Sequence, residues 1–136
     1  MPTLIRRLAL SALLLLASGG VVADWVQVED SPEDGGYKTY LDPKTVLKSV
    51  GLVRVWTFTD YAQVQVAGGV LQFMSIRAQH EYDCRQQVWR TLQLTAHSRN
   101  RLQGRVVHQE SEPGSWAPVV PDTAGDVRFK LLCRYL

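Results

Sequence analysis

The chain has 136 residues, of which 46% are hydrophobic, and it carries 15 basic against 13 acidic side chains. This length suits a single domain with a modest core, and no repeat or low-complexity tract suggests a second unit. Arg6 and Arg7 are the only charged residues among residues 1–23, and residues 24–136 carry 13 charges of each sign. The charge balance therefore gives no argument for nucleic acid or an anionic membrane as partner, and we expect neither.

The first residues have the form of a secretory signal peptide. Arg6 and Arg7 supply the positive start, residues 8–17 are an unbroken apolar run, and Val21-Val22-Ala23 offers small residues for a signal peptidase. The apolar run is well short of the roughly 20 residues that a membrane anchor needs. We therefore expect residues 1–23 to be cleaved, leaving an exported domain of residues 24–136 that has no transmembrane segment. That domain would work in the periplasm, at the cell surface or outside the cell.

The next part of the chain alternates with the period of two that indicates β-strands. Strands are expected at 25–28, 37–41, 52–59, 73–84, 88–98 and 105–109. Polar or glycine-rich stretches at 29–36 and 63–71 predict loops, and a basic turn is expected at 98–104. Within 88–98 the alternation places Trp89, Thr91, Gln93 and Thr95 on one face of the sheet. The pattern is typical of an antiparallel sheet with one buried and one wet face.

The end of the chain fits two structures. Asp122-Thr123 can cap a helix that begins after Pro121, and Phe129, Leu132, Cys133 and Leu136 would then share one helix face. The residues from 127 to 135 also alternate as a strand would. Periodicity alone does not decide between helix and strand here.

The chain has two cysteines, Cys84 and Cys133. In an oxidising compartment such a pair is expected to form one disulfide, whereas a metal-ligand pair or a catalytic thiol would need companion residues that the sequence lacks. His80, His97 and His108 are each isolated, and we interpret them as surface histidines. No serine lies in a nucleophile motif. The sequence therefore predicts no catalytic residue, no metal site and no cofactor, and we expect a protein that is not an enzyme.

The basic turn is the candidate ligand contact. Arg99, Arg101 and Arg105 gather within seven positions of a predicted hairpin turn. Such a positive tip suits an acidic glycan or an acidic patch on a protein. These three arginines form the predicted contact site.

A series of landmarks along the chain resembles the surface-adhesin protein E family of secreted bacterial proteins. The landmarks are Trp25, Tyr40-Leu41-Asp42-Pro43, the segment 55–61 (VWTFTDY), Glu81-Tyr82-Asp83-Cys84, the segment 116–121 (WAPVVP) and Cys133. The resemblance implies an α+β fold, a single small domain in which a C-terminal helix packs on an antiparallel β-sheet of about six strands. It favours the helix at the end of the chain and ties that helix to the sheet through Cys84 and Cys133.

Named members of that family are adhesins that bind host matrix proteins, some as dimers. The resemblance therefore implies an exported, non-enzymatic binding module that contacts a host matrix protein or a glycan, with a homodimer as one assembly it allows. The alternative is a periplasmic accessory or inhibitor-like domain that binds another bacterial protein.

Overall fold

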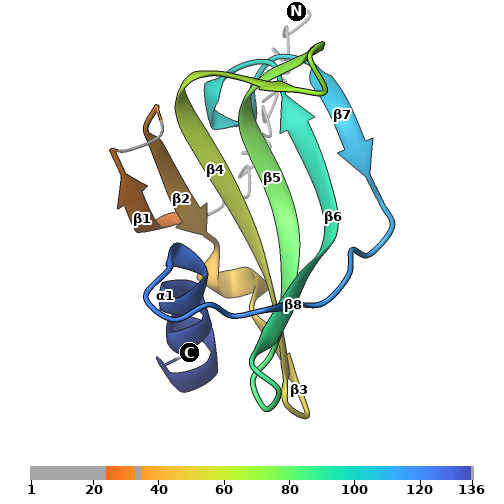
Figure 1. The fold of residues 1–136 in the computed structure, drawn as a ribbon. Coiled ribbons are helices and arrows are strands. Elements are labelled where there is room, and N and C mark those ends of the chain that lie inside the picture. Colours follow the sequence, from red (N-terminus) through yellow and green to blue (C-terminus); the bar gives the residue numbers. More distant parts are fainter. Residues whose placement is uncertain (1–23, 33–34, 136) are drawn as a thin grey trace, which may run out of the picture.

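The structure is a computed structural model that describes residues 24–32 and 35–135, which form an antiparallel sheet and a short C-terminal helix (Figure 1). Six strands lie in the order β1-β2-β4-β5-β6-β7, with β3 paired to β4 and β8 to β6. The strands are β1 (Val26–Ser31), β2 (Tyr37–Leu41), β3 (Leu47–Ser49), β4 (Leu52–Ala67), β5 (Leu71–Asp83), β6 (Val88–His97), β7 (Val106–Glu110) and β8 (Ala117–Pro118). The predicted fold class is confirmed. The predicted signal peptide, residues 1–23, lies outside the described residues.

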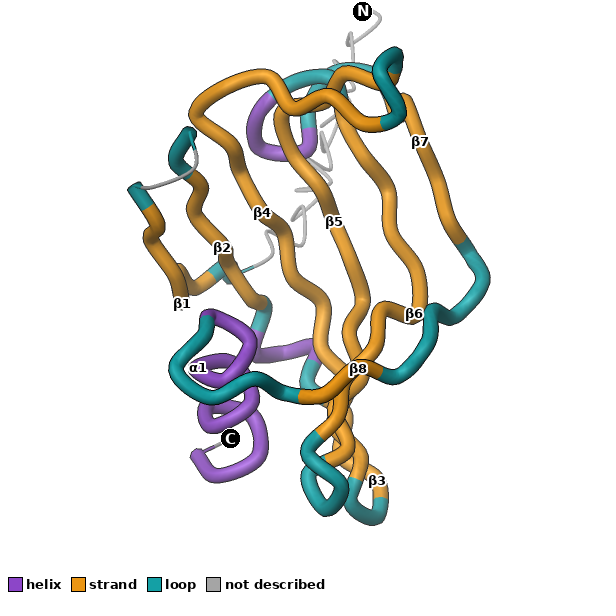
Figure 2. The backbone as a smooth tube through the Cα atoms, viewed as in Figure 1, coloured by secondary structure: helices purple, strands orange, loops and turns teal. Residues whose placement is uncertain are grey.

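Two predicted loops are shorter in the structure than in the sequence prediction. β4 continues to Ala67 and pairs with Leu71 of β5, so the loop expected over 63–71 shrinks to a tight turn (Figure 2). Gly68 and Gly69 adopt positive φ angles of 58° and 75°, which glycine allows at no steric cost. β1 likewise runs to Ser31, into the stretch expected to be a loop. The sequence pattern detects only the part of a strand that has a buried face. Backbone hydrogen bonds between paired strands extend these strands beyond that part.

A β-bulge changes the faces of β6. Gln79 pairs with Gln93 and His80 pairs with Thr91, so Leu92 is an extra residue on β6. Trp89 and Thr91 then face one side of the sheet while Gln93 and Thr95 face the other. The prediction that these four residues share a face is wrong, because one inserted residue reverses the alternation for everything after it.

The end of the chain is helical. α1 (Ala124–Lys130) begins at Thr123, whose Oγ1 accepts a hydrogen bond from the Asp126 backbone N–H at 3.3 Å. A wider π-type turn, η3 (Leu131–Tyr135), continues it. Figure 1 shows α1 beside the lower part of the sheet, below β1 and β2. The core between them consists of Leu41, Val53, Val55, Tyr82, Phe129 and Leu132.

A disulfide closes this core. Cys84, which follows β5, is bonded to Cys133 of η3, with a Cα–Cα distance of 5.7 Å and a sequence separation of 49. In the chain-entropy picture, a loop of this length stabilises the domain by about 4 kcal/mol. The disulfide therefore ties the C-terminal helical segment covalently to the end of β5.

Candidate binding site on the polar face of the sheet

The sheet face turned away from α1 carries mostly polar and charged side chains, and we call it the polar face. Strand residues alternate between faces, so the buried Val53 and Val55 place Arg54 and Trp56 on the opposite side. Cross-strand pairing extends this face across the neighbouring strands. Its members are Asp30, Lys38, Tyr40, Arg54, Trp56, Phe58, Asp60, Ser75, Arg77, Gln79, Glu81, Arg90, Gln93, Thr95 and His97.

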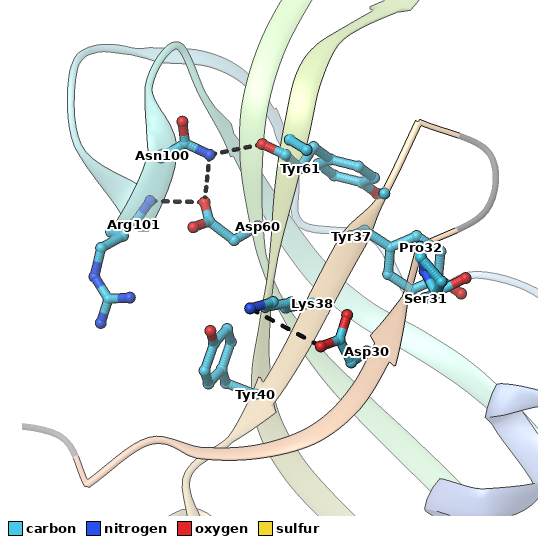
Figure 3. Close-up of a pocket in the computed structure, with 12 residues that line it drawn as sticks. Asp30, Ser31, Pro32, Tyr37, Lys38, Tyr40, Asp60, Tyr61, Asn100 and Arg101 are labelled. Atoms are coloured by element: carbon cyan, nitrogen blue, oxygen red, sulfur yellow. Dashed lines mark hydrogen bonds and ion pairs between the residues drawn. The ribbon is translucent and has the colours of Figure 1, made fainter.

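One end of the polar face is hollowed into a cleft of about 510 Å³ (Figure 3). It lies between β2, β4 and the 3₁₀ turn η2 (Asn100–Leu102) that follows β6. Lys38, Tyr40, Asp60 and Arg101 are among the residues that line it. With Asp30, Tyr37 and Tyr61, which also line it, the cleft brings two cations, two carboxylates and three phenols to one hollow.

Two polar side chains of the sheet fix the turn that forms one wall of the cleft. Asp60 Oδ1 accepts hydrogen bonds from Asn100 Nδ2 at 2.8 Å and from the Arg101 backbone N–H at 2.9 Å. The fully buried Ser75 Oγ donates to the Arg99 carbonyl at 2.6 Å and accepts from the Leu102 N–H at 3.0 Å. These bonds hold Arg101 at a φ of 55°, in the left-handed region that a non-glycine residue rarely adopts. The Arg101 side chain is thus presented from a turn whose backbone is already ordered.

Aromatic rings support the charged groups at this end. Tyr40 stacks on Phe58 with ring centroids 4.6 Å apart, and the Arg101 guanidinium lies 6.0 Å from the centre of the Phe58 ring. Lys38 Nζ lies 3.9 Å from Asp30 Oδ2, and both side chains are more than half exposed, so this ion pair is weak. Lys38 and Arg101 both remain accessible to a ligand.

The middle of the polar face combines one stacked arginine with neutral hydrogen-bonding groups. The Arg77 guanidinium lies 4.4 Å from the centre of the Trp56 ring, at cation–π distance. Beside it, Gln93 Nε2 donates to Gln79 Oε1 at 3.0 Å. Burial and the charge of Arg77 lower the pKa of His97, which is on the same face. His97 is therefore neutral near pH 7 and adds no charge to this region.

A buried carboxylate organises the other end. Glu81, only 1% exposed, accepts from Arg54 Nε at 2.6 Å and from Arg90 Nη2 at 2.8 Å. Burial opposes the ionisation of Glu81, but the hydrogen bonds from the two arginines outweigh it and hold its pKa below the usual value. Arg90 also lies over the ring of Trp116 at 4.4 Å. Two cations share one buried anion here, so this end of the face has a net positive charge.

The structure separates the three arginines of the predicted contact. Arg101 lines the cleft, whereas Arg105 lines a different groove, beside Val70 and Leu71. Arg99 is exposed at the start of the turn. Sequence reasoning missed the other cations of the polar face, which are Lys38, Arg54, Arg77 and Arg90. The alternation within 52–59 places Arg54 and Trp56 on one face, and the alternation within 73–84 does the same for Arg77 and Glu81. This alternation was the signal in the sequence that could have indicated these cations.

The histidines differ from their sequence interpretation. His80 is not a surface residue: it lies under the helix-covered face, 8% exposed, with its Nδ1 3.2 Å from Thr91 Oγ1. Burial and then the charge of Arg128 lower its pKa to about 3. Among residues 24–32 and 35–135, no group of three or more histidine, cysteine, aspartate or glutamate side chains is placed to hold a metal ion. In the same part of the chain, no helix has the length and apolarity to span a membrane.

Comparison with known proteins identifies the family. The structure of protein E from non-typeable Haemophilus influenzae is 12% identical, with a TM-score of 0.57 over 85% of this chain and 78% of that chain. A second Haemophilus influenzae protein E structure is 11% identical, with a TM-score of 0.57 over 79% and 83% of the two chains. At such identity the likeness shows a shared fold. No curated protein sequence matches significantly. The family model of surface-adhesin protein E, however, matches residues 25–134, and this chain therefore belongs to the surface-adhesin protein E family.

Proposed function

We propose that this protein is an exported, non-enzymatic adhesin-type binding module that contacts a host matrix protein or glycan through the polar face. The observation that carries the proposal is the arrangement of that face: Lys38, Arg77 and Arg101 stand on a fixed scaffold on the side of the sheet opposite the helix. Family membership supports the adhesin role.

Two features of the cleft favour binding over catalysis. Of its two carboxylates, Asp60 has an oxygen engaged by two N–H donors of the turn, which is a structural role, and Asp30 is paired with Lys38. The histidine with the most strongly shifted pKa, His80, lies on the opposite face of the sheet and is buried in the core. A general acid or base needs to reach the substrate proton, so neither Asp60 nor His80 is placed as the centre of a reaction in this cleft.

Export is part of the proposal. We infer that residues 1–23 are removed as a signal peptide, so that the disulfide between Cys84 and Cys133 forms outside the cytoplasm. Mass spectrometry of the exported protein should give an N-terminus at Asp24. Protein that still begins at Met1 would contradict the export route.

The function is tested by two measurements on the producing cells and the purified exported protein. Protease added to intact cells should remove the protein, and the purified protein should bind immobilised matrix proteins or glycans. A variant with Lys38→Gln, Arg77→Gln and Arg101→Gln, the face variant, should lose most of that binding. It should keep its fold, because exposed substitutions usually change stability by no more than about 0.5 kcal/mol each.

A control variant removes three cations that lie outside the polar face. It carries Lys48→Gln, Arg85→Gln and Arg134→Gln, all at exposed positions. This variant has the same change in net charge, and we expect it to bind as the unchanged protein does. A purely periplasmic pool that no external protease reaches would contradict the adhesin role and favour the periplasmic accessory domain.

A further inference from the structure

The polar face has a positive charge that its own carboxylates do not offset. Its cations are Lys38, Arg54, Arg77, Arg90 and Arg101. It has three carboxylates against these five cations: Glu81 is buried between two arginines, Asp60 holds the backbone of the turn, and the exposed Asp30 is paired with Lys38, so a net positive charge remains. Because the domain without residues 1–23 is formally neutral, this positive face is a local asymmetry. A ligand that approaches the face meets positive charge first.

The cations are spread along the strands rather than gathered at one point. Arg54 and Arg90 flank Glu81 at one end, the Arg77 guanidinium lies 4.4 Å from the centre of the Trp56 ring, and the Arg101 guanidinium lies 6.0 Å from the centre of the Phe58 ring. Trp56 and Phe58 follow Arg54 in steps of two residues along β4, so at about 3.4 Å per residue the three cationic stations (Arg54 with Arg90, Arg77, and Arg101) span roughly 14 Å. A small anion can occupy one station only. A linear polyanion can occupy all three.

The surface between the stations suits a polysaccharide better than a protein. It carries amide and hydroxyl groups, from Gln79, Gln93 and Thr95, that match sugar hydroxyls. Arginine guanidinium groups lie over two of the large rings, Arg77 over Trp56 and Arg90 over Trp116, and Tyr40 stacks on Phe58. Protein interfaces centre on desolvated apolar and aromatic anchors, whereas the Trp56 and Trp116 rings of this face have guanidinium groups over them.

We propose that the polar face binds a sulfated polysaccharide laid along strands β4 and β5, with its anionic groups on the arginine stations and on Lys38. Four of the five cations are arginines, whose planar, weakly hydrated guanidinium donates paired hydrogen bonds to oxyanions. This inference rests on the proposed binding function and specifies its ligand class and the path of that ligand.

Binding of the purified exported protein to immobilised heparin, measured from 0.05 to 0.3 M salt, tests the proposal. We expect the affinity to fall steeply with salt, because each neutralised anion releases counterions. The face variant should bind about tenfold more weakly or worse, with a salt slope smaller by about two. The control variant should keep both values. If the face variant does not fold, as judged by near-ultraviolet circular dichroism, Arg77→Gln alone should still weaken binding several-fold.

Parallel probes decide the ligand class. Hyaluronan carries carboxylates without sulfates, and polyglutamate stands for an acidic protein; both should bind much more weakly than heparin at equal salt. Equal binding of either probe, or heparin binding that the face variant retains, overturns the proposal. If the protein binds matrix proteins but not heparin, and the face variant no longer binds the matrix proteins, the proposal of a sulfated polysaccharide is wrong and the proposed function stands. If no matrix protein or glycan binds at all, the proposed function fails with it.

Discussion

Mild acid should destabilise the domain through His80, at pH values where carboxylates are still ionised. The imidazole is packed between Tyr82 and Trp89, with ring centroids 6.5 and 5.5 Å away, and it lies on a sheet face that also feels the charge of Arg128. Burial first, and then that charge, lower the pKa of His80 from 6.5 to about 3. The folded protein therefore holds this histidine neutral in a range where the unfolded chain protonates it.

The pKa difference sets the size of the effect. Because the unfolded state binds the proton more readily, the contribution of His80 to stability is complete above pH 6.5 and is lost as the pH falls from 6.5 toward 3. Within that window each pH unit removes about 1.4 kcal/mol. Lowering the pH to 5.0 should therefore cost about 2 kcal/mol, a considerable share of the stability of a domain of this size.

Urea unfolding at pH 7.5 and 5.0 measures this loss, and His80→Gln is the matched variant because glutamine does not titrate. The variant will differ in stability at pH 7.5, but its loss between the two pH values should be smaller by about 2 kcal/mol. His97 also has a lowered pKa and acts in the same direction, but it is present in both proteins and cancels. Equal losses in the two proteins would refute the reasoning, as would an NMR titration of folded His80 with a midpoint near 6.5.

Three further changes test the packing. Replacing Cys84 and Cys133 with serine should lower the free energy of unfolding by about 4 kcal/mol, and an unchanged urea midpoint would show that the bond does not stabilise the fold. Glu81→Gln leaves two arginines without their shared carboxylate and should cost about 2 kcal/mol in the same assay, whereas a gain in stability would contradict a structural role for this carboxylate. Gly104→Ala should lower the free energy of unfolding by about 2 kcal/mol or more, because the φ of Gly104 is 76° and the new Cβ would lie 2.2 Å from Ser98 Oγ. Gly69 has a φ of 75° with nothing within 4 Å of the added Cβ, so Gly69→Ala should lower the free energy of unfolding by only about 1 kcal/mol. Equal losses in the two glycine variants would exclude the clash at position 104 as the cause.

Local patterns in the sequence carried most of the secondary structure. The β-branched and aromatic run at 52–59 and the alternation at 73–84 predicted the two central strands, because their buried faces require that pattern. The sequence pattern did not decide between a helix and a strand at the end of the chain, because either structure can bury Phe129 with the same apolar residues. Only the resemblance to a family separated the two.

The features that the sequence did not predict depend on pairing between distant residues. The bulge at Leu92 has no local signal, yet it decides that Gln93 belongs to the polar face. The three cationic stations likewise come from β4, β5, β6 and the turn after β6, and only the register brings them into one surface. Closeness in the sequence predicted one contact site at Arg99, Arg101 and Arg105, whereas in the structure Arg101 and Arg105 line different hollows.

The way in which the turn after β6 is anchored has a consequence for how this surface can evolve. Asp60 and Ser75 hold the turn through backbone groups and Asn100, and no side-chain hydrogen bond of Arg99 or Arg101 takes part among the residues that the structure describes. Substitutions at positions 99 and 101 can therefore alter what the cleft recognises while the path of the main chain stays the same. The chemistry of this surface can therefore diverge between relatives through a few exposed side chains, while the fold that presents them stays the same.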